Sequence, residues 1–287
     1  MSGTLAGKTV ALSGPTGGIG KELCRLLLRE GAALILLDRS PERSAALQSA
    51  LKTEFPGAVL TRIPLDLADI DTVRAACAQL RSLPLDILIH NAGAYAIPRY
   101  TTKNGFDNVY HINAYAPYIM TRTLLPHLRE RGGRVVAVGS IAHRYSKTDP
   151  ADVDFHTRRR DSLVYGNAKR RLMFALYELF RTETEADLCI CHPGITLTNI
   201  TAHYPKAVFT LIKPFMKVLF MPPRRAAQNV LRACTEDCAY HEWIGPQLFD
   251  IWGKPAKRVL HSAKAAECAA IFDEMENSIK EPLNTMG

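Results

Sequence analysis

Short runs of apolar residues alternate with longer amphipathic stretches along the first two-thirds of the chain. The runs contain few polar positions, which is typical of strands buried on both faces of a sheet. We expect strands at 8–12, 33–37, 58–63, 85–90, 134–139 and 187–192. Between them, apolar residues recur every three or four positions, and this spacing predicts helices. These helices are expected near 18–30, 41–54, 69–82 and 104–130, with a further one that begins close to Tyr165.

The alternation of strands and helices predicts an α/β fold. Parallel strands joined by right-handed helical crossovers give one Rossmann-type, doubly wound sheet of about seven strands with helices on both faces. No linker rich in proline or glycine interrupts the pattern, so we expect a single domain over residues 1–287. The last quarter adds an apolar segment at 205–223, a helix at 224–236, a strand at 246–251 and a terminal helix.

Composition and charge argue against several classes of protein. The 287 residues are 47% hydrophobic and 22% charged, as in ordinary globular domains. No stretch resembles a membrane span or a secretory signal, so we expect a cytoplasmic protein. The net charge of +8 lies in short clusters without interleaved aromatic residues, which disfavours nucleic-acid binding. An anionic cofactor, an acidic substrate and peripheral contact with a membrane surface remain open.

The seven cysteines do not have the spacing of a disulfide framework or a zinc site. Cys189 and Cys191 lie in a predicted strand, and we expect both to be inert. Cys234 and Cys238 are four residues apart, but no histidine pair accompanies them at ligand spacing. We therefore expect no metal site and a reducing compartment.

A glycine-rich turn follows the first predicted strand. Ser13–Gly20 reads SGPTGGIG, a turn that lets the backbone approach a pyrophosphate at the N-terminus of the next helix. Asp38 ends the second strand, where a carboxylate accepts a hydrogen bond from a ribose 2′-hydroxyl and repels a 2′-phosphate. Asp38 could instead cap the turn before Pro41, and the guanidinium of Arg39 suits a phosphate.

Tyr165 and Lys169 belong to a second motif, YGNAK, which precedes a strongly apolar run. At a separation of four residues, the two side chains are neighbours on one face of the predicted helix. On this spacing alone, an amphipathic helix with a polar start is the simpler explanation.

Several motifs together resemble the short-chain dehydrogenase/reductase family over about residues 7–200. The glycines have the spacing G-x-x-x-G-x-G, HNAG at 90–93 resembles N-N-A-G, YGNAK matches Y-x-x-x-K, and PGITLT at 193–198 resembles P-G-x-x-x-T. Departures are Pro15 in the turn, His90 in place of asparagine, and an extra segment at about 145–161 between Ser140 and Tyr165. This segment and the C-terminal tail make the chain most similar to the retinol-dehydrogenase-like branch.

The resemblance implies a role for each matching residue. Tyr165 would be the general acid/base, and Lys169 would lower its pKa and bind the nicotinamide ribose. Ser140 would hold the substrate oxygen, and Asn113 would anchor a water molecule beside Lys169. The positions implied to bind the cofactor are Ser13, Gly14, Thr16, Gly18, Ile19, Gly20, Asp38, Arg39, Asp66, Leu67, Asn91, Ala92, Gly93, Tyr165, Lys169, Pro193, Gly194, Ile195 and Thr198. The expected cofactor is NAD because of Asp38, with NADP as the alternative because of Arg39.

The implied activity is hydride transfer between a nicotinamide cofactor and an alcohol or carbonyl on a lipophilic substrate such as a sterol, a retinoid or a long-chain carbonyl compound. The segment at about 195–225, with its apolar residues at 205–223, is expected to be a substrate lid, although core packing or membrane contact would also explain it. Candidate pocket walls are Tyr95, Ile97, His143 and Tyr145. Alternatives are an NADP-dependent reductase of small carbonyl compounds, a lyase or epimerase that recycles NAD, and an NAD(P)-binding regulator without catalysis. A homodimer or homotetramer is compatible with the resemblance.

Overall fold

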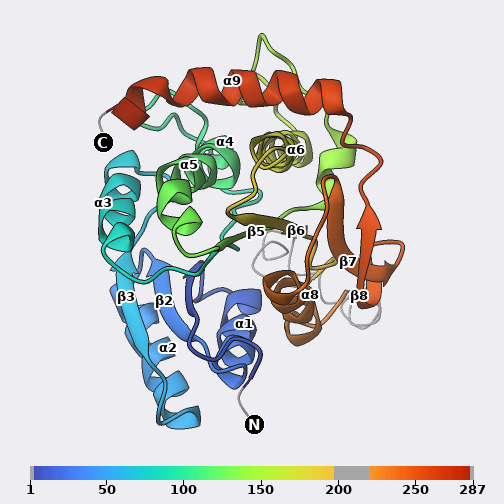
Figure 1. Cartoon of the computed structure of the whole chain (residues 1–287). Coiled ribbons are helices and arrows are strands. Elements are labelled where there is room, and N and C mark those ends of the chain that lie inside the picture. Colours follow the sequence, from blue (N-terminus) through green and yellow to red (C-terminus); the bar gives the residue numbers. More distant parts are fainter. Residues whose placement is uncertain (1–2, 197–219, 285–287) are drawn as a thin grey trace, which may run out of the picture.

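The predicted doubly wound sheet forms the centre of the molecule (Figure 1). A computed structural model describes residues 3–196 and 220–284. The strand order is β3-β2-β1-β4-β5-β6-β7-β8, and all neighbouring strands from β3 to β7 are parallel. The first six strands each end within two residues of the predicted positions. They are Thr9–Ser13 (β1), Ala33–Asp38 (β2), Leu60–Pro64 (β3), Ile87–His90 (β4), Arg134–Val138 (β5) and Asp187–Cys191 (β6).

The C-terminal end of the sheet differs from the prediction. Instead of one strand at 246–251, β7 (Glu242–Leu248) and β8 (Trp252–Val259) form an antiparallel hairpin, so the sheet has eight strands. The apolar pattern misses β8 because this strand contains Pro255 and several basic residues. Proline and lysine are tolerated at the edge of a sheet, where one side of the strand has no neighbour.

Helices cover both faces of the sheet (Figure 1). One face carries α1 (Gly18–Arg29), α2 (Pro41–Glu54) and α8 (Pro223–Thr235). The other face carries α3 (Ile70–Arg81), α5 (Ala116–Arg129) and α6 (Asp161–Leu179). The predicted helix at 104–130 begins later and is divided into α4 (Asn108–Tyr110), a π-helical turn at His111–Tyr115 and α5. Among the described residues, no helix is both long enough and apolar enough to cross a membrane.

The C-terminal helix α9 (Ala265–Asn284) packs outside α6 and α5. Its Glu274 pairs with Arg171, whose side chain is fully buried in α6. Its Glu276 accepts a hydrogen bond from the Tyr118 hydroxyl at 2.6 Å and pairs with Arg122 at 2.8 Å. The first contact joins α9 to α6, which carries the YGNAK motif, and the other two join it to α5.

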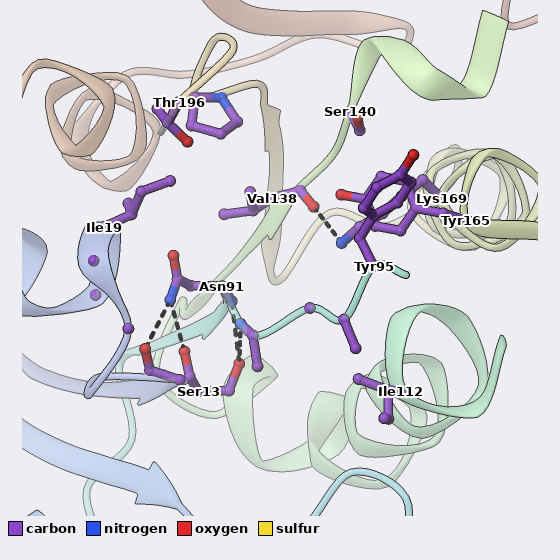
Figure 2. Close-up of a pocket in the computed structure, with 18 of the residues that line it drawn as sticks. Ser13, Ile19, Asn91, Tyr95, Ile112, Val138, Ser140, Tyr165, Lys169 and Thr196 are labelled. Carbon is purple, nitrogen blue, oxygen red and sulfur yellow. Dashed lines mark hydrogen bonds between the residues drawn. The ribbon is translucent and has the colours of Figure 1, made fainter. Parts of the chain in front are cut away.

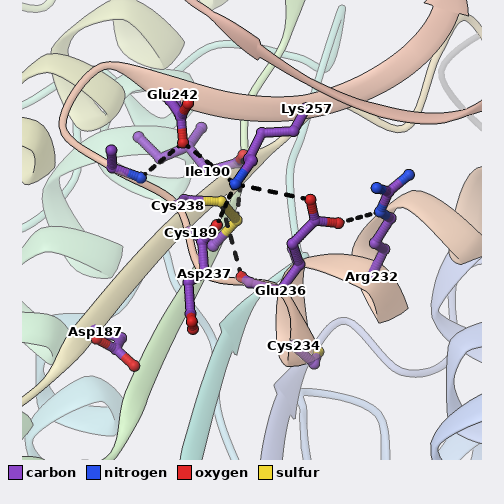
Figure 3. The surroundings of a disulfide bond; sticks show 12 residues. Asp187, Cys189, Ile190, Arg232, Cys234, Glu236, Asp237, Cys238, Glu242 and Lys257 are labelled. Atoms are coloured by element: carbon purple, nitrogen blue, oxygen red, sulfur yellow. Dashed lines mark hydrogen bonds and ion pairs between the residues drawn. A yellow bond between two sulfur atoms is a disulfide. The ribbon is translucent and has the colours of Figure 1, made fainter.

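Cys189 in β6 and Cys238 after α8 form a disulfide (Figure 3). The expectation that Cys189 is an inert strand residue is therefore wrong, and the cysteines no longer indicate a reducing compartment. The two residues are 49 positions apart in the sequence but their Cα atoms are 5.3 Å apart. Their spacing in the sequence could not reveal the pair, because Cys238 meets Cys189 only where the chain after α8 returns to the side of β6. Cys191 and Cys234 are buried and not disulfide-bonded.

Candidate active site

The glycine turn and the YGNAK motif meet at one cavity of about 1070 Å³ (Figure 2). Its walls come from the carboxyl ends of the parallel strands, which is where open α/β sheets bind ligands. The predicted site residues that line it are Ser13, Gly14, Thr16, Gly18, Ile19, Gly20, Asp38, Arg39, Asp66, Leu67, Asn91, Ala92, Gly93, Ser140, Tyr165, Lys169, Pro193, Gly194 and Ile195. Of the remaining two, Asn113 lies behind the cavity wall, and Thr198 falls outside the described residues.

Two glycines allow the tight turn between β1 and α1. Gly14 has a φ of +67°, and a Cβ atom there would lie 3.0 Å from the Cα of Ala92. A Cβ atom on Gly20 would lie 2.1 Å from the carbonyl oxygen of Gly14. A side chain at Gly20 would therefore force the turn apart. The turn ends at Gly17, the N-cap of α1, and the first residues of the helix, Gly18 to Gly20, line the cavity. The free N–H groups of a helix N-terminus suit an anionic group.

Ser13 and Asn91 join the end of β1 to the end of β4 (Figure 2). The Ser13 hydroxyl accepts hydrogen bonds from the N–H groups of Asn91 (3.1 Å) and Ala92 (3.0 Å) and donates to the carbonyl of Ile89 (3.2 Å). The Asn91 side-chain amide donates to the carbonyls of Ser13 (3.0 Å) and Gly14 (3.2 Å). Both side chains line the cavity, but these polar groups fix the backbone of the glycine turn.

Asp38 places a carboxylate at the far end of the same cavity. One carboxylate oxygen pairs with Arg62 of β3 at 3.3 Å. The other, Oδ2, is buried and has no hydrogen-bond partner in the part of the chain that the structure describes. Ser40, not Asp38, caps α2 by accepting a hydrogen bond from the N–H of Arg43, so the alternative reading of Asp38 as a helix cap is wrong. A buried, unpartnered acceptor fits a ligand hydroxyl.

Two basic residues flank Asp38 on the cavity wall. Arg39 is exposed, and Arg43 donates to the carbonyl of Thr16 at 3.2 Å. Sequence reasoning identified Arg39 but missed Arg43 and Arg62. Arg43 could have been predicted from its position in the first turn of α2, close in sequence to Asp38. Arg62 could not, because it meets Asp38 only through the pairing of β2 and β3 in the sheet.

Tyr165 and Lys169 point into the opposite end of the cavity from α6 (Figure 2). The buried Lys169 ammonium donates to the carbonyl of Val138 at 2.9 Å and lies 5.8 Å from the centre of the Tyr165 ring. The ring of Tyr95 packs edge-on against Tyr165 at 5.4 Å. Gly166 is required beside Tyr165 because a Cβ atom there would lie 2.5 Å from the carbonyl oxygen of Ala142. The glycine thus lets α6 approach the turn that begins at Ser140.

Ser140 is the first residue of that turn, which continues as a 3₁₀ helix over Ile141–Tyr145. Its hydroxyl accepts a hydrogen bond from the N–H of Ala142 at 3.2 Å, and it lies near enough to Tyr165 to favour the ionised form of the phenol. Ser140, Tyr165 and Lys169 therefore lie together, as the sequence motifs imply.

Burial shifts the acid–base groups at this end of the cavity toward their neutral forms. Burial raises the pKa of Tyr165 to about 12, and the hydrogen bond with Ser140 opposes that rise. Burial lowers the pKa of Lys169 to about 8. The sequence predicts that Lys169 and a bound nicotinamide together lower the pKa of Tyr165, which concerns the complex with cofactor. In the protein alone, removal from water has the largest effect on this pKa. Near neutral pH, Tyr165 keeps its proton and Lys169 is mainly charged.

Asn113 supports the loop that follows β4. Its side-chain amide donates to the carbonyls of Ala94 and Val109, both at 2.8 Å, and its carbonyl oxygen accepts from the N–H of Ala94 at 3.2 Å. A Cβ atom on Gly93 would lie 2.9 Å from this oxygen, so Gly93 permits the approach. Asn113 lies in the π-helical turn, a distortion frequent at functional sites. The water-anchoring role of Asn113 stays a prediction.

Comparison with known proteins shows which family the chain belongs to. The family model for short chain dehydrogenases matches residues 8–149. Retinol dehydrogenase 12 of Mus musculus is 30% identical over 220 residues, which cover 74% of this chain and 70% of that protein. This chain belongs to the short-chain dehydrogenase family. Within the family it lies in the retinol-dehydrogenase-like branch, which confirms the resemblance of the motifs.

Two further relatives extend the comparison. Dehydrogenase/reductase SDR family member 13 of Bos taurus is 34% identical over 252 residues, which cover 85% of this short-chain dehydrogenase but 65% of the bovine protein. The chain thus spans about two-thirds of the length of that relative. A crystal structure of an uncharacterized protein from Mycobacterium Paratuberculosis has a TM-score of 0.77 at 25% identity and covers 97% of this chain and 95% of that chain.

The walls around Tyr165 in this short-chain dehydrogenase are mostly apolar. Of the predicted pocket walls, Tyr95, Ile97 and Tyr145 line the cavity, whereas His143 is buried beside it and does not. Sequence reasoning missed Ile112, Ile141, Ala142 and Ser162, which also line it. Most of the predicted lid, residues 197–219, falls outside the described residues. Phe220, which follows this gap, lines the cavity.

Proposed function

We propose that this short-chain dehydrogenase transfers a hydride between a nicotinamide cofactor and an alcohol or carbonyl group on a lipophilic substrate. The observation that supports this most strongly is the shared cavity. Ser140, Tyr165 and Lys169 lie at one end of it, and the glycine turn and Asp38 lie at the other. A site that binds one extended ligand and presents a proton donor beside it is suited to this reaction.

The residues at the glycine end fit a dinucleotide. The glycine turn and the N-terminus of α1 would hold the pyrophosphate, and the unpartnered Oδ2 of Asp38 would accept a hydrogen bond from a ribose hydroxyl. Lys169 would donate to the ribose next to the nicotinamide ring. When bound, the nicotinamide supplies or accepts the hydride.

The residues of the chain itself would move the proton. Tyr165 carries a proton at neutral pH because burial raises its pKa to about 12, so it enters carbonyl reduction as a proton donor. Ser140 would hold the same substrate oxygen by donating a hydrogen bond to it. Alcohol oxidation requires the phenol oxygen to accept a proton instead. The Lys169 ammonium and the Ser140 hydroxyl stabilise the phenolate that this direction needs.

NAD is the proposed cofactor, because the free oxygen of Asp38 suits a ribose 2′-hydroxyl and its charge repels a 2′-phosphate. Arg39 and Arg43 oppose this choice, since guanidinium groups at the same end of the cavity attract phosphate. Values of kcat/KM measured with both cofactors decide between them. A preference for NADP of about tenfold or more overturns the choice of NAD.

The proposed substrate class rests on the walls and on the relatives. Tyr95, Ile97, Ile112, Tyr145 and Phe220 form an apolar surface near Tyr165, which suits a lipophilic molecule. Retinol dehydrogenase 12 is named for such an alcohol. The cytoplasmic location, the lid at about 195–225 and a homodimer or homotetramer remain predictions.

A panel assay tests the proposal. The protein is incubated with NAD and lipophilic alcohols, including retinol, and with small alcohols as controls, while the absorbance of reduced nicotinamide is followed. The reverse reaction is tested with the matching carbonyl compounds and reduced cofactor. We expect turnover that favours the lipophilic members of the panel. Tight cofactor binding without turnover of any alcohol or carbonyl compound would indicate a regulator instead.

A further inference from the structure

His143 has hydrogen-bond partners on both sides of its ring although it does not line the cavity. Its side chain is fully buried. Nδ1 lies 2.6 Å from the carbonyl oxygen of Ser140, and Nε2 lies 2.7 Å from the hydroxyl of Ser262. The ring also packs edge-on against Trp243 at 5.8 Å and against Phe174 at 6.1 Å.

The partners of His143 determine which ring nitrogen carries the proton. A backbone carbonyl can only accept, so Nδ1 must be protonated and donate to Ser140. In the neutral ring Nε2 is then an acceptor, and Ser262 must donate its hydroxyl proton to it. Burial lowers the pKa of His143 to about 4, so the neutral ring is the form present near neutral pH.

This arrangement fixes the backbone at Ser140. The carbonyl of Ser140 accepts hydrogen bonds from the ring Nδ1 of His143 and, at 3.2 Å, from its backbone N–H. The Ser140 hydroxyl accepts a hydrogen bond from the N–H of Ala142. A second contact comes from α6, where Arg170 donates to the carbonyl of His143 at 3.0 Å. Arg170 is in turn paired with Glu267 of α9. Ser262, between β8 and α9, therefore reaches the turn of Ser140 through the ring of His143, and Glu267 of α9 reaches it through Arg170.

We propose that His143 is a positioning residue for the Ser140 hydroxyl and that the Ser262 hydroxyl orients its ring. The proposal rests on the proposed function, in which Ser140 holds the substrate oxygen. His143 keeps the carbonyl of Ser140 in one orientation, and this sets the direction of the hydroxyl toward Tyr165. Displacement of a catalytic group by about 1 Å can lower a rate on the order of 100-fold.

The rival explanation is that His143 only fills space between Trp243 and Phe174. Two substitutions separate these roles. His143→Phe keeps an aromatic ring in the packing but removes both hydrogen bonds. His143→Asn loses the ring but places its side-chain amide near the position of Nδ1, where it can still donate to Ser140. Ser262→Ala keeps the ring of His143 and removes the hydroxyl that orients it.

If the proposal is correct, the variant that is less stable should be the more active one. His143→Asn should lose more stability, and His143→Phe should lose more turnover. We expect His143→Phe to lower kcat roughly 10- to 100-fold with the KM for the cofactor unchanged. We expect His143→Asn to have the lower melting temperature but a kcat within about threefold of the parent, because the donor to Ser140 is retained. Ser262→Ala should lower kcat by about three- to tenfold without a matching loss of stability.

Equal losses of kcat in His143→Phe and His143→Asn, or a kcat in His143→Phe near that of the parent, overturn the proposal. NMR of protein labelled with ¹⁵N-histidine gives a readout that does not depend on activity. The signal that disappears in His143→Phe, among nine histidines, belongs to His143. It should show a protonated Nδ1 and an unprotonated Nε2, and the other tautomer excludes the proposed geometry. Absence of turnover in the parent protein counts against the proposed function, whereas an Nε2-protonated ring counts against the role of His143.

Discussion

The two ends of the cavity are built in different ways. At the glycine end, close backbone contacts and side chains such as Ser13 and Asn91 hold the main chain in a fixed shape. At the other end, Tyr165 and Lys169 are held among apolar and neutral groups, and burial shifts the pKa of each toward its neutral form. The glycine end thus depends mainly on the fixed shape of its backbone, whereas the Tyr165 end depends mainly on the protonation states of buried groups. Changes at the two ends should therefore affect different measurements.

The largest expected effect is on turnover, from Tyr165→Phe. The ring and its contact with Tyr95 remain, and only the hydroxyl that exchanges a proton is lost. We expect kcat to fall by about 10²- to 10⁴-fold, with the Kd for the dinucleotide changed by less than about threefold. Steady-state kinetics and calorimetric titration of the same preparation measure both quantities. A kcat near that of the parent would remove Tyr165 from the reaction.

At the glycine end, Gly20→Ala should weaken binding of the dinucleotide, whereas Tyr165→Phe leaves that binding nearly unchanged. The added Cβ atom would lie 2.1 Å from the carbonyl oxygen of Gly14, so the turn must open. We expect the Kd for the dinucleotide to rise by about 10-fold or more. Gly57→Ala is the matched control, because a Cβ atom at Gly57 meets nothing within 4 Å. Unchanged affinity in Gly20→Ala would show that the shape of this turn does not control binding.

A smaller effect is expected from Asp38→Ala, which removes a charge at the glycine end without changing its shape. The repulsion of a 2′-phosphate is lost while Arg39 and Arg43 remain, so the ratio of kcat/KM for NADP to that for NAD should rise by about tenfold. Arg43→Leu should lower the same ratio. If neither substitution changes the ratio, the two residues do not contact the ribose in the bound state.

The smallest expected effect is a change of kcat with pH, which should arise from the Tyr165 end and not from the glycine end. Because burial lowers the pKa of Lys169 to about 8, its positive charge is present below that pH and is lost as the pH rises through it. We expect kcat for alcohol oxidation to show an inflection near pH 8 that is absent in Lys169→Met. The affinity of Gly20→Ala relative to the parent should stay constant over the same range. An unchanged inflection in Lys169→Met would assign it to another group.

The sequence predicts the parts of the site that follow from local patterns. Strands β1, β2, β4, β5 and β6 consist largely of apolar residues, and the glycine turn and YGNAK have fixed spacings, so their positions could be read directly. Strand β3 contains Arg62 and is less apolar. The disulfide between Cys189 and Cys238 and the pairing of Arg62 with Asp38 depend on segments that meet only in three dimensions. Strand β8 was missed because its edge position permits Pro255 and basic residues.

The role of burial was the least predictable feature. Spacing placed Tyr165 beside Lys169, but the sequence could not show how far both are removed from water. In the protein alone, this burial raises the pKa of Tyr165 to about 12. His143 was similarly predicted to be a pocket wall because it is close in sequence to Ser140. Its ring instead points to Ser262, which is 119 residues away.

The ionisation of Tyr165 is the most direct test of the electrostatic account. The difference in ultraviolet absorbance between the parent and Tyr165→Phe isolates this one among ten tyrosines during a pH titration. We predict that the protein alone shows no Tyr165 phenolate near neutral pH, because burial raises the pKa of Tyr165 to about 12. Addition of NAD, which carries a positive charge on its nicotinamide ring, should lower that pKa, and NADH should not. A phenolate at neutral pH in the protein alone, or a titration that NAD leaves unchanged, would contradict the account.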